Sequence, residues 1–135
     1  MNTELILKLL NRLLGSIRFF DGFVAEFCRL IAGAGVEERV IALLTTRLRQ
    51  LGQLGLQATR LEEFEPIEGG VYSMHLSGRS FNLRILYGFL PNREPVLLLP
   101  FYERGGKRKT DYTQHLGTAK ARLAVVKEAF EDGRK

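Results

Sequence analysis

The fold is decided by the stretch FNLRILYGFL at residues 81–90, where large apolar side chains recur at every second position. A period of two residues is that of a β-strand with one face in the core. Asn82 and Arg84 fall on the opposite face, so this strand carries a cation near its middle. The apolar face consists of Phe81, Leu83, Ile85, Tyr87 and Phe89.

Two further strands flank this one. The strand-like runs are VYSMHL at 71–76 and VLLLPFYE at 96–103, and the turns that join the three are SGRS at 77–80 and PNREP at 91–95. Turns this short connect neighbouring antiparallel strands. The sequence therefore predicts a three-stranded antiparallel meander.

Helical periodicity surrounds the meander, and the third helix ends in a loop that contains Gly52 and Gly55. Helices before a meander and one helix after it define an α+β domain. We expect a small antiparallel sheet with the N-terminal helices and the C-terminal helix packed on one of its faces. The expected helices cover 3–14, 22–32, 36–51 and 112–131, and a short strand covers 16–20.

The helix expected at 3–14 carries one apolar stripe. Such a stripe is buried either on the protein's own core or on a partner, and the sequence favours the core. The stripe consists of Leu5, Ile6, Leu9, Leu10, Leu13 and Leu14.

Length and composition bound the class of protein. A chain of 135 residues with 45% hydrophobic and 26% charged residues suits one globular domain over 1–135, in which residues 1–14 form an added helix. The lone Cys28 excludes an intramolecular disulfide and any CxxC motif, which favours a reducing cytoplasm. Charged residues interrupt the apolar stretch 4–31, so we expect no membrane span.

Charge is distributed unevenly along the chain. Residues 1–70 hold 8 Lys and Arg against 9 Asp and Glu, whereas residues 71–135 hold 12 against 6, a net charge of +6. This asymmetry indicates a polyanionic partner for the second half, although an ordinary basic surface accounts for it equally well.

Common catalytic and cofactor motifs are missing. Gly106-Lys107 is followed by Arg108, where a phosphate-binding loop needs Ser or Thr. His75, His115 and Cys28 are not spaced as metal ligands, and the chain has no GxSxG motif. We therefore expect neither a metal nor a small-molecule cofactor.

A set of basic and aromatic residues remains. Asn82 and Arg84 share a strand face, and the meander brings the neighbouring strands and the start of the last helix close to it. Each residue of the set also has an ordinary structural interpretation, as an exposed strand charge, a solvated loop or a packing aromatic. The set consists of His75, Arg84, Tyr102, Arg104, Lys107, Arg108, Lys109 and Tyr112.

Over about residues 36–130 the chain resembles the RelE superfamily of bacterial toxins, most closely the HigB-type or phage-derived branch of type II toxin–antitoxin systems. The resemblance lies in the order of its segments, and Thr110-Asp111 stands where many relatives have Thr-Pro. The segments are ERVIALLTTRLRQLGQLG at 38–55, EPIEGGVYSMHL at 65–76, LRILY at 83–87 and KRKT at 107–110.

The resemblance implies metal-independent cleavage of mRNA, often in the ribosomal A site, and inhibition by a cognate helix-turn-helix antitoxin. RNA is cut when its 2′-OH attacks the adjacent phosphorus, so the protein must move protons and stabilise phosphate charge. Arginine suits the phosphate, and histidine or tyrosine suits the proton transfers, with acid and base left open. The residues matched to catalysis are His75, Arg84, Lys107, Arg108 and Tyr112, and those expected to bind RNA are Arg79, Tyr102, Arg104 and Lys109.

Two alternatives stay open. One is a non-catalytic RNA-binding or phage accessory protein of the same fold. The other is an unrelated basic α+β protein that acts through protein contacts, with the N-terminal stripe as its interface.

Overall fold

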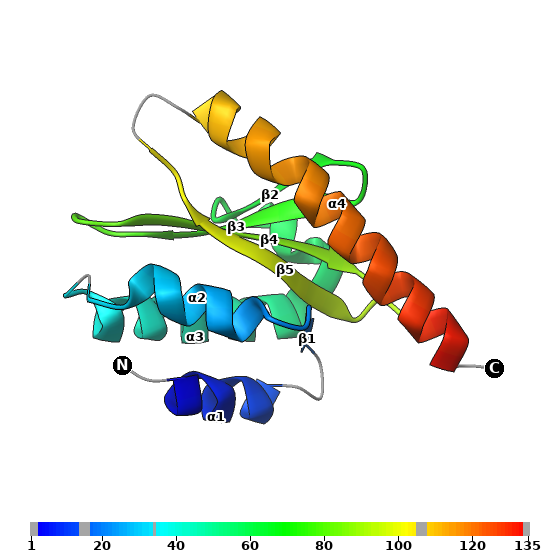
Figure 1. The fold of residues 1–135 in the computed structure, drawn as a ribbon, viewed down its shortest axis with the longest axis horizontal. Helices are drawn as coiled ribbons and strands as arrows, with labels where there is room; N and C mark the ends of the chain where they lie inside the picture. The colour runs from blue at the N-terminus through cyan, green and yellow to red at the C-terminus, as the bar shows by residue number, and fades with distance from the viewer. Residues whose placement is uncertain (1–2, 14–16, 34, 105–107, 134–135) are drawn as a thin grey trace.

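The computed structural model describes residues 3–13, 17–33, 35–104 and 108–133. A five-stranded sheet lies between two helical layers (Figure 1). The helices α1 (Thr3–Leu13), α2 (Phe23–Ile31) and α3 (Glu37–Leu54) lie on one side of the sheet, and α4 (Arg108–Gly133) crosses the other side. The α+β class that the sequence predicts is confirmed.

The sheet has the strand order β1-β5-β4-β3-β2. The three predicted strands are present as β3, β4 and β5, and each pairs antiparallel with the next. The strands are β1 (Arg18–Phe19), β2 (Phe64–Glu68), β3 (Val71–Ser77), β4 (Asn82–Phe89) and β5 (Pro95–Tyr102).

The expectation of a purely antiparallel sheet is wrong, because β1 pairs parallel with β5. The predicted loop that contains Gly52 and Gly55 is also wrong, because Gly52 lies within α3 and Gly55 begins the 3₁₀ helix Gly55–Arg60. The edge strand β2, which follows, was not predicted. Pro66 weakens the strand signal of β2. Gly69 and Gly70 have φ of 62° and 81°, a left-handed conformation that favours glycine, and they turn β2 back onto β3.

The expectation that all helices pack on one face is also wrong, because α4 covers the face opposite α2 and α3. The reason lies in β5, whose residues Pro95–Phe101 are all buried. A continuous apolar strand needs cover on both faces, whereas an alternating strand needs cover on one. The second core, under α4, joins Leu86 and Phe101 of the sheet to Ala119 and Leu123 of the helix.

The N-terminal helix belongs to the protein's own core. Ile6 and Leu10 are fully buried where α1 packs against α2 and α3, and Leu9 is partly buried. Leu5 is 48% exposed, so the predicted stripe is buried only in part. The side chain of Leu13, and all of Leu14, lie outside the described part of the chain.

Two arginines donate hydrogen bonds to backbone carbonyls of the sheet, one from each side of it. Arg122 of α4 donates to the carbonyl of Leu98 on β5 and forms a bidentate pair with Glu26 of α2 at 2.6 and 2.9 Å. On the other edge, Nε of Arg47 donates to the carbonyl of His75 at 2.9 Å. Among the described helices, none is both long enough and apolar enough to cross a membrane.

Candidate functional site

Three parts of the chain lie at one end of the sheet. They are the turn between β3 and β4, residues 103–104 after β5, and the first turns of α4 (Figure 1, left of the view). Most of the predicted site residues come from these segments.

His75 and Arg84 are direct partners across the β3–β4 ladder. Partners of this kind point to the same face of a sheet, and Phe101, the partner of Arg84 on β5, packs under α4. The imidazole and the guanidinium therefore both lie on the face of the sheet that α4 covers.

The imidazole of His75 is held by a carboxylate. Its Nε2 lies 2.9 Å from Oε1 of Glu65 on β2, and the two side chains are 19% and 30% exposed. An ionised carboxylate only accepts hydrogen bonds, so Nε2 carries a proton in this pair.

Arg84 is enclosed rather than exposed. Its Nη2 donates to Oε2 of Glu103 at 2.7 Å, and the two side chains are 8% and 9% exposed. Asn82 donates to the same oxygen at 2.9 Å, and Ser77 donates to Oδ1 of Asn82 at 2.9 Å. Nη1 of Arg84 donates to Oγ of Ser77 at 3.0 Å, which closes a four-residue ring.

Tyr112 is a buried residue of the second core. Its hydroxyl lies 2.7 Å from Oγ of Ser73, and its ring meets Phe101 edge-on with centroids 5.3 Å apart. The side chain is 7% exposed, which fits the packing interpretation of a helix-start tyrosine better than stacking on an RNA base.

Arg104 is fastened to α4 by Asp111. The main-chain N–H of Arg104 donates to Oδ2 of Asp111 at 2.7 Å, and its Nε donates to Oδ1 at 2.8 Å. These hydrogen bonds lower the pKa of the Asp111 carboxyl from its ordinary value. Asp111 therefore ties the start of α4 to the residue two positions beyond β5.

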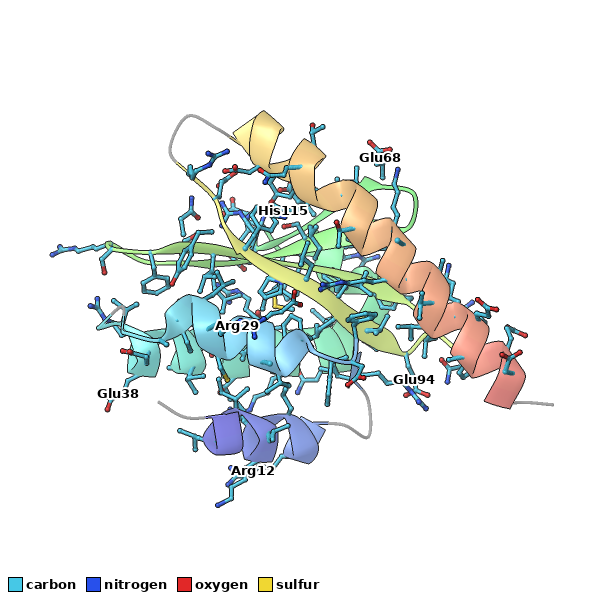
Figure 2. All side chains as sticks on the ribbon, viewed as in Figure 1. Arg12, Arg29, Glu38, Glu68, Glu94 and His115 are labelled. Carbon is cyan, nitrogen blue, oxygen red and sulfur yellow. The ribbon has the colours of Figure 1, made fainter. Side chains whose placement is uncertain are left out.

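His115 lies one turn further along α4. Figure 2 labels it between the helix and the sheet, and its ring stacks on Phe101 with centroids 4.5 Å apart. Burial is the largest influence on its pKa, which is lowered from the ordinary value of 6.5 although the nearby Asp111 raises it.

Tyr102 does not join the site. Its register partner is Leu83, and its hydroxyl donates to the carbonyl of Leu30 in α2, so its side chain lies on the face opposite Arg84. The expectation that Tyr102 lies beside Arg84 is therefore wrong, because the two residues differ by one step in a ladder of period two.

The structure describes the side chains of only some of the predicted basic residues. Arg79 is exposed in the turn between β3 and β4, and Arg104 has a 58% exposed side chain. Lys107 lies outside the described residues, and Arg108 and Lys109 belong to the first turn of α4 without a described side chain. A cleft of about 640 Å³ opens beside this end; it is lined by Ser77, Gly78, Arg79, Ser80, Phe81, Asn82, Tyr102 and Glu103.

Sequence reasoning missed two acidic partners of the site, Glu65 and Glu103, whereas Asp111 was noted as a departure from the RelE-type pattern. One signal was available, because Glu103 follows Phe101 by two residues and Phe101 shares a face with Arg84. No signal in the sequence pointed to Glu65, since its strand β2 was not predicted. Over the described ranges, no group of three His, Cys, Asp or Glu side chains could hold a metal ion.

Comparison with known proteins gives no relative. No family model matches the chain, and no curated protein and no solved structure matches it either.

Proposed function

We propose that this protein binds single-stranded RNA at the end of the sheet that carries His75 and Arg84, and cleaves it as a RelE-type toxin. The observation that carries the proposal is the pairing of these two residues across β3 and β4, with Glu65 on the imidazole. It joins a group that can move a proton to a group that can stabilise phosphate charge.

His75 is the proton-transfer group in this proposal. Glu65 holds the imidazole through Nε2, which fixes the ring for taking the proton of the 2′-OH or for protonating the leaving 5′-oxygen. Histidine is the residue type suited to either role near neutral pH, since an unperturbed imidazole has a pKa of about 6.5. Tyr112 is less suited, since its hydroxyl is already bonded to Ser73 in the core.

Several groups at this end of the sheet can stabilise the charge of a phosphate. Arg84 lies next to His75, and the loop that begins at Arg104 leads into the 26-residue helix α4. A helix N-terminus favours anions, and the basic run 107–109 adds charge in the same segment. By the resemblance, we propose mRNA in the ribosomal A site as substrate, a helix-turn-helix antitoxin as partner, and the cytoplasm as the place of action.

A second function is favoured by one observation. Arg84 is paired with Glu103 and Arg104 with Asp111, so two cations of the site are each opposed by a carboxylate. This balance suits a non-catalytic RNA-binding protein, which needs exposed cations such as Arg79 but no acid–base group.

Single-turnover cleavage separates the two functions. Unmodified RNA is incubated with excess protein, either free in EDTA or on translating ribosomes in a magnesium buffer. We expect cleavage by the wild type and a loss of about 100-fold or more in His75→Ala, the usual effect of removing a general acid or base. His115→Gln, which changes the other histidine of the chain, serves as control. Binding without cleavage by the wild type leaves the non-catalytic function.

A further inference from the structure

The Arg84 ring has the composition of an anion-binding site that is already filled. Nη2 of Arg84 and Nδ2 of Asn82 converge on a single oxygen, Oε2 of Glu103, at 2.7 and 2.9 Å. We infer that these donors bind a phosphodiester oxygen of RNA, and that the Glu103 carboxylate occupies their position in the free protein. The identity of the ligand rests on the proposed function.

The donors keep their orientation without Glu103. Nη1 of Arg84 donates to Oγ of Ser77 at 3.0 Å and to the carbonyl of Leu83 at 3.2 Å, so two bonds fix the plane of the guanidinium. Its Nε is buried and has no hydrogen-bond partner among the described residues. Arg84 therefore has an unused donor, as well as the one that Glu103 occupies.

A ligand can reach the position from solvent. Glu103 and Asn82 both line the cleft of about 640 Å³ beside the β3–β4 turn. That volume falls within the range of about 300–1,000 Å³ that is usual for ligand pockets. Ser77 and Arg79 line the same cleft, so it also carries polar and basic groups.

Exchange of one anion for another suits a buried cation. Removing Glu103 alone would leave Arg84 enclosed without a counter-charge, which is strongly unfavourable. A phosphate that enters as Glu103 leaves keeps the charge compensated, and it accepts from the guanidinium as a carboxylate does. The carboxylate thus competes directly with RNA and keeps the site closed in its absence.

The test measures binding of a 2′-O-methyl RNA oligonucleotide, which lacks the attacking hydroxyl and cannot be cleaved. Glu103→Gln removes the competing charge and keeps the side-chain shape. Glu94→Gln is the matched control, because it removes the same charge from the Arg18–Glu94 pair in the turn at the opposite end of the sheet (Figure 2). We expect Glu103→Gln to bind the oligonucleotide about tenfold more tightly than Glu94→Gln, the scale of one charge-assisted hydrogen bond.

The gain must depend on Arg84. Adding Arg84→Lys to Glu103→Gln should abolish it, because lysine lacks the planar fork. Equal affinity of Glu103→Gln and Glu94→Gln, or a gain that survives Arg84→Lys, overturns the inference. If Glu103→Gln does not fold, Arg84→Lys alone should weaken binding several-fold, while Arg18→Lys leaves it unchanged; equal binding by these two overturns the inference as well.

Cleavage of unmodified RNA is measured in parallel. Tighter binding by Glu103→Gln without cleavage by the wild type supports the phosphate site and removes the nuclease proposal. Cleavage by the wild type, with no tighter binding of the oligonucleotide by Glu103→Gln, supports the nuclease proposal and overturns the phosphate site.

Discussion

Asp111, in the first turn of α4, accepts hydrogen bonds from both the main-chain N–H and the guanidinium of Arg104, the second residue after β5. The carboxylate is buried while the arginine side chain is largely exposed. The pair therefore ties the first turn of α4 to the second residue after β5.

The Asp111 anchor should make stability depend on acid pH. The folded-state pKa of Asp111 lies below its ordinary value of 3.8, so its ionised form is stabilised by folding. That contribution is present above the unfolded-state pKa and is lost as the pH falls through the folded-state pKa. We expect the free energy of unfolding in urea, measured between pH 2 and 7, to be higher for the wild type than for Asp111→Asn. The difference should be constant above about pH 5 and should shrink at lower pH. A difference that does not change with pH contradicts this role.

His115 should titrate below pH 6.5, because burial against Phe101 disfavours its charged form. NMR can follow its ring protons, since the chain has 2 histidines. In Asp111→Asn the pKa of His115 should fall further, because the nearby carboxylate raises it in the wild type. A higher pKa in that variant would show that Asp111 does not act on the imidazole.

Removing only one member of the Arg84–Glu103 pair should strongly lower the free energy of unfolding. Arg84→Met leaves the Glu103 carboxylate enclosed without its cation, and such changes typically destabilise by about 3–5 kcal/mol. Arg84→Met combined with Glu103→Leu removes both charges and should regain most of that loss. The four free energies of unfolding form a double-mutant cycle, and additive effects would mean that the two side chains are not coupled.

The N-terminal helix offers a matched pair of leucines. Leu10 is 1% exposed and Leu5 is 48% exposed. Leu10→Ala should destabilise the protein by about 2–5 kcal/mol, as deletions in a packed core do. Leu5→Ala should change stability by less than about 0.5 kcal/mol. Chemical denaturation of both variants measures this, and equal effects would mean that α1 is not anchored through Leu10.

Much of the fold could be predicted because its signals are local. Alternation along 81–90, short turns and helical spacing identified β3, β4 and β5 and the four α-helices to within a few residues. Strand β2 was not predicted, because the proline and the two glutamates in it have low strand propensity. Only its pairing with β3 makes this segment a strand. The RelE-type function that the resemblance implies, and the roles of Lys107, Arg108 and Lys109, stay predictions.

The sequence by itself determined which elements form, since periodicity and turn chemistry are properties of neighbouring residues. It also placed His75 and Arg84 on neighbouring antiparallel strands, because a short turn joins those strands, whereas the register that makes the two residues direct partners is seen only in the structure. Only the tertiary structure decided what each charge faces. Glu103, Glu65 and Asp111 reach their partners across strands and from a helix, and burial makes each carboxylate a counter-ion. Pairing of this kind depends on distances in space, and Arg84 is therefore an enclosed cation rather than the exposed strand charge that its position in sequence also allowed.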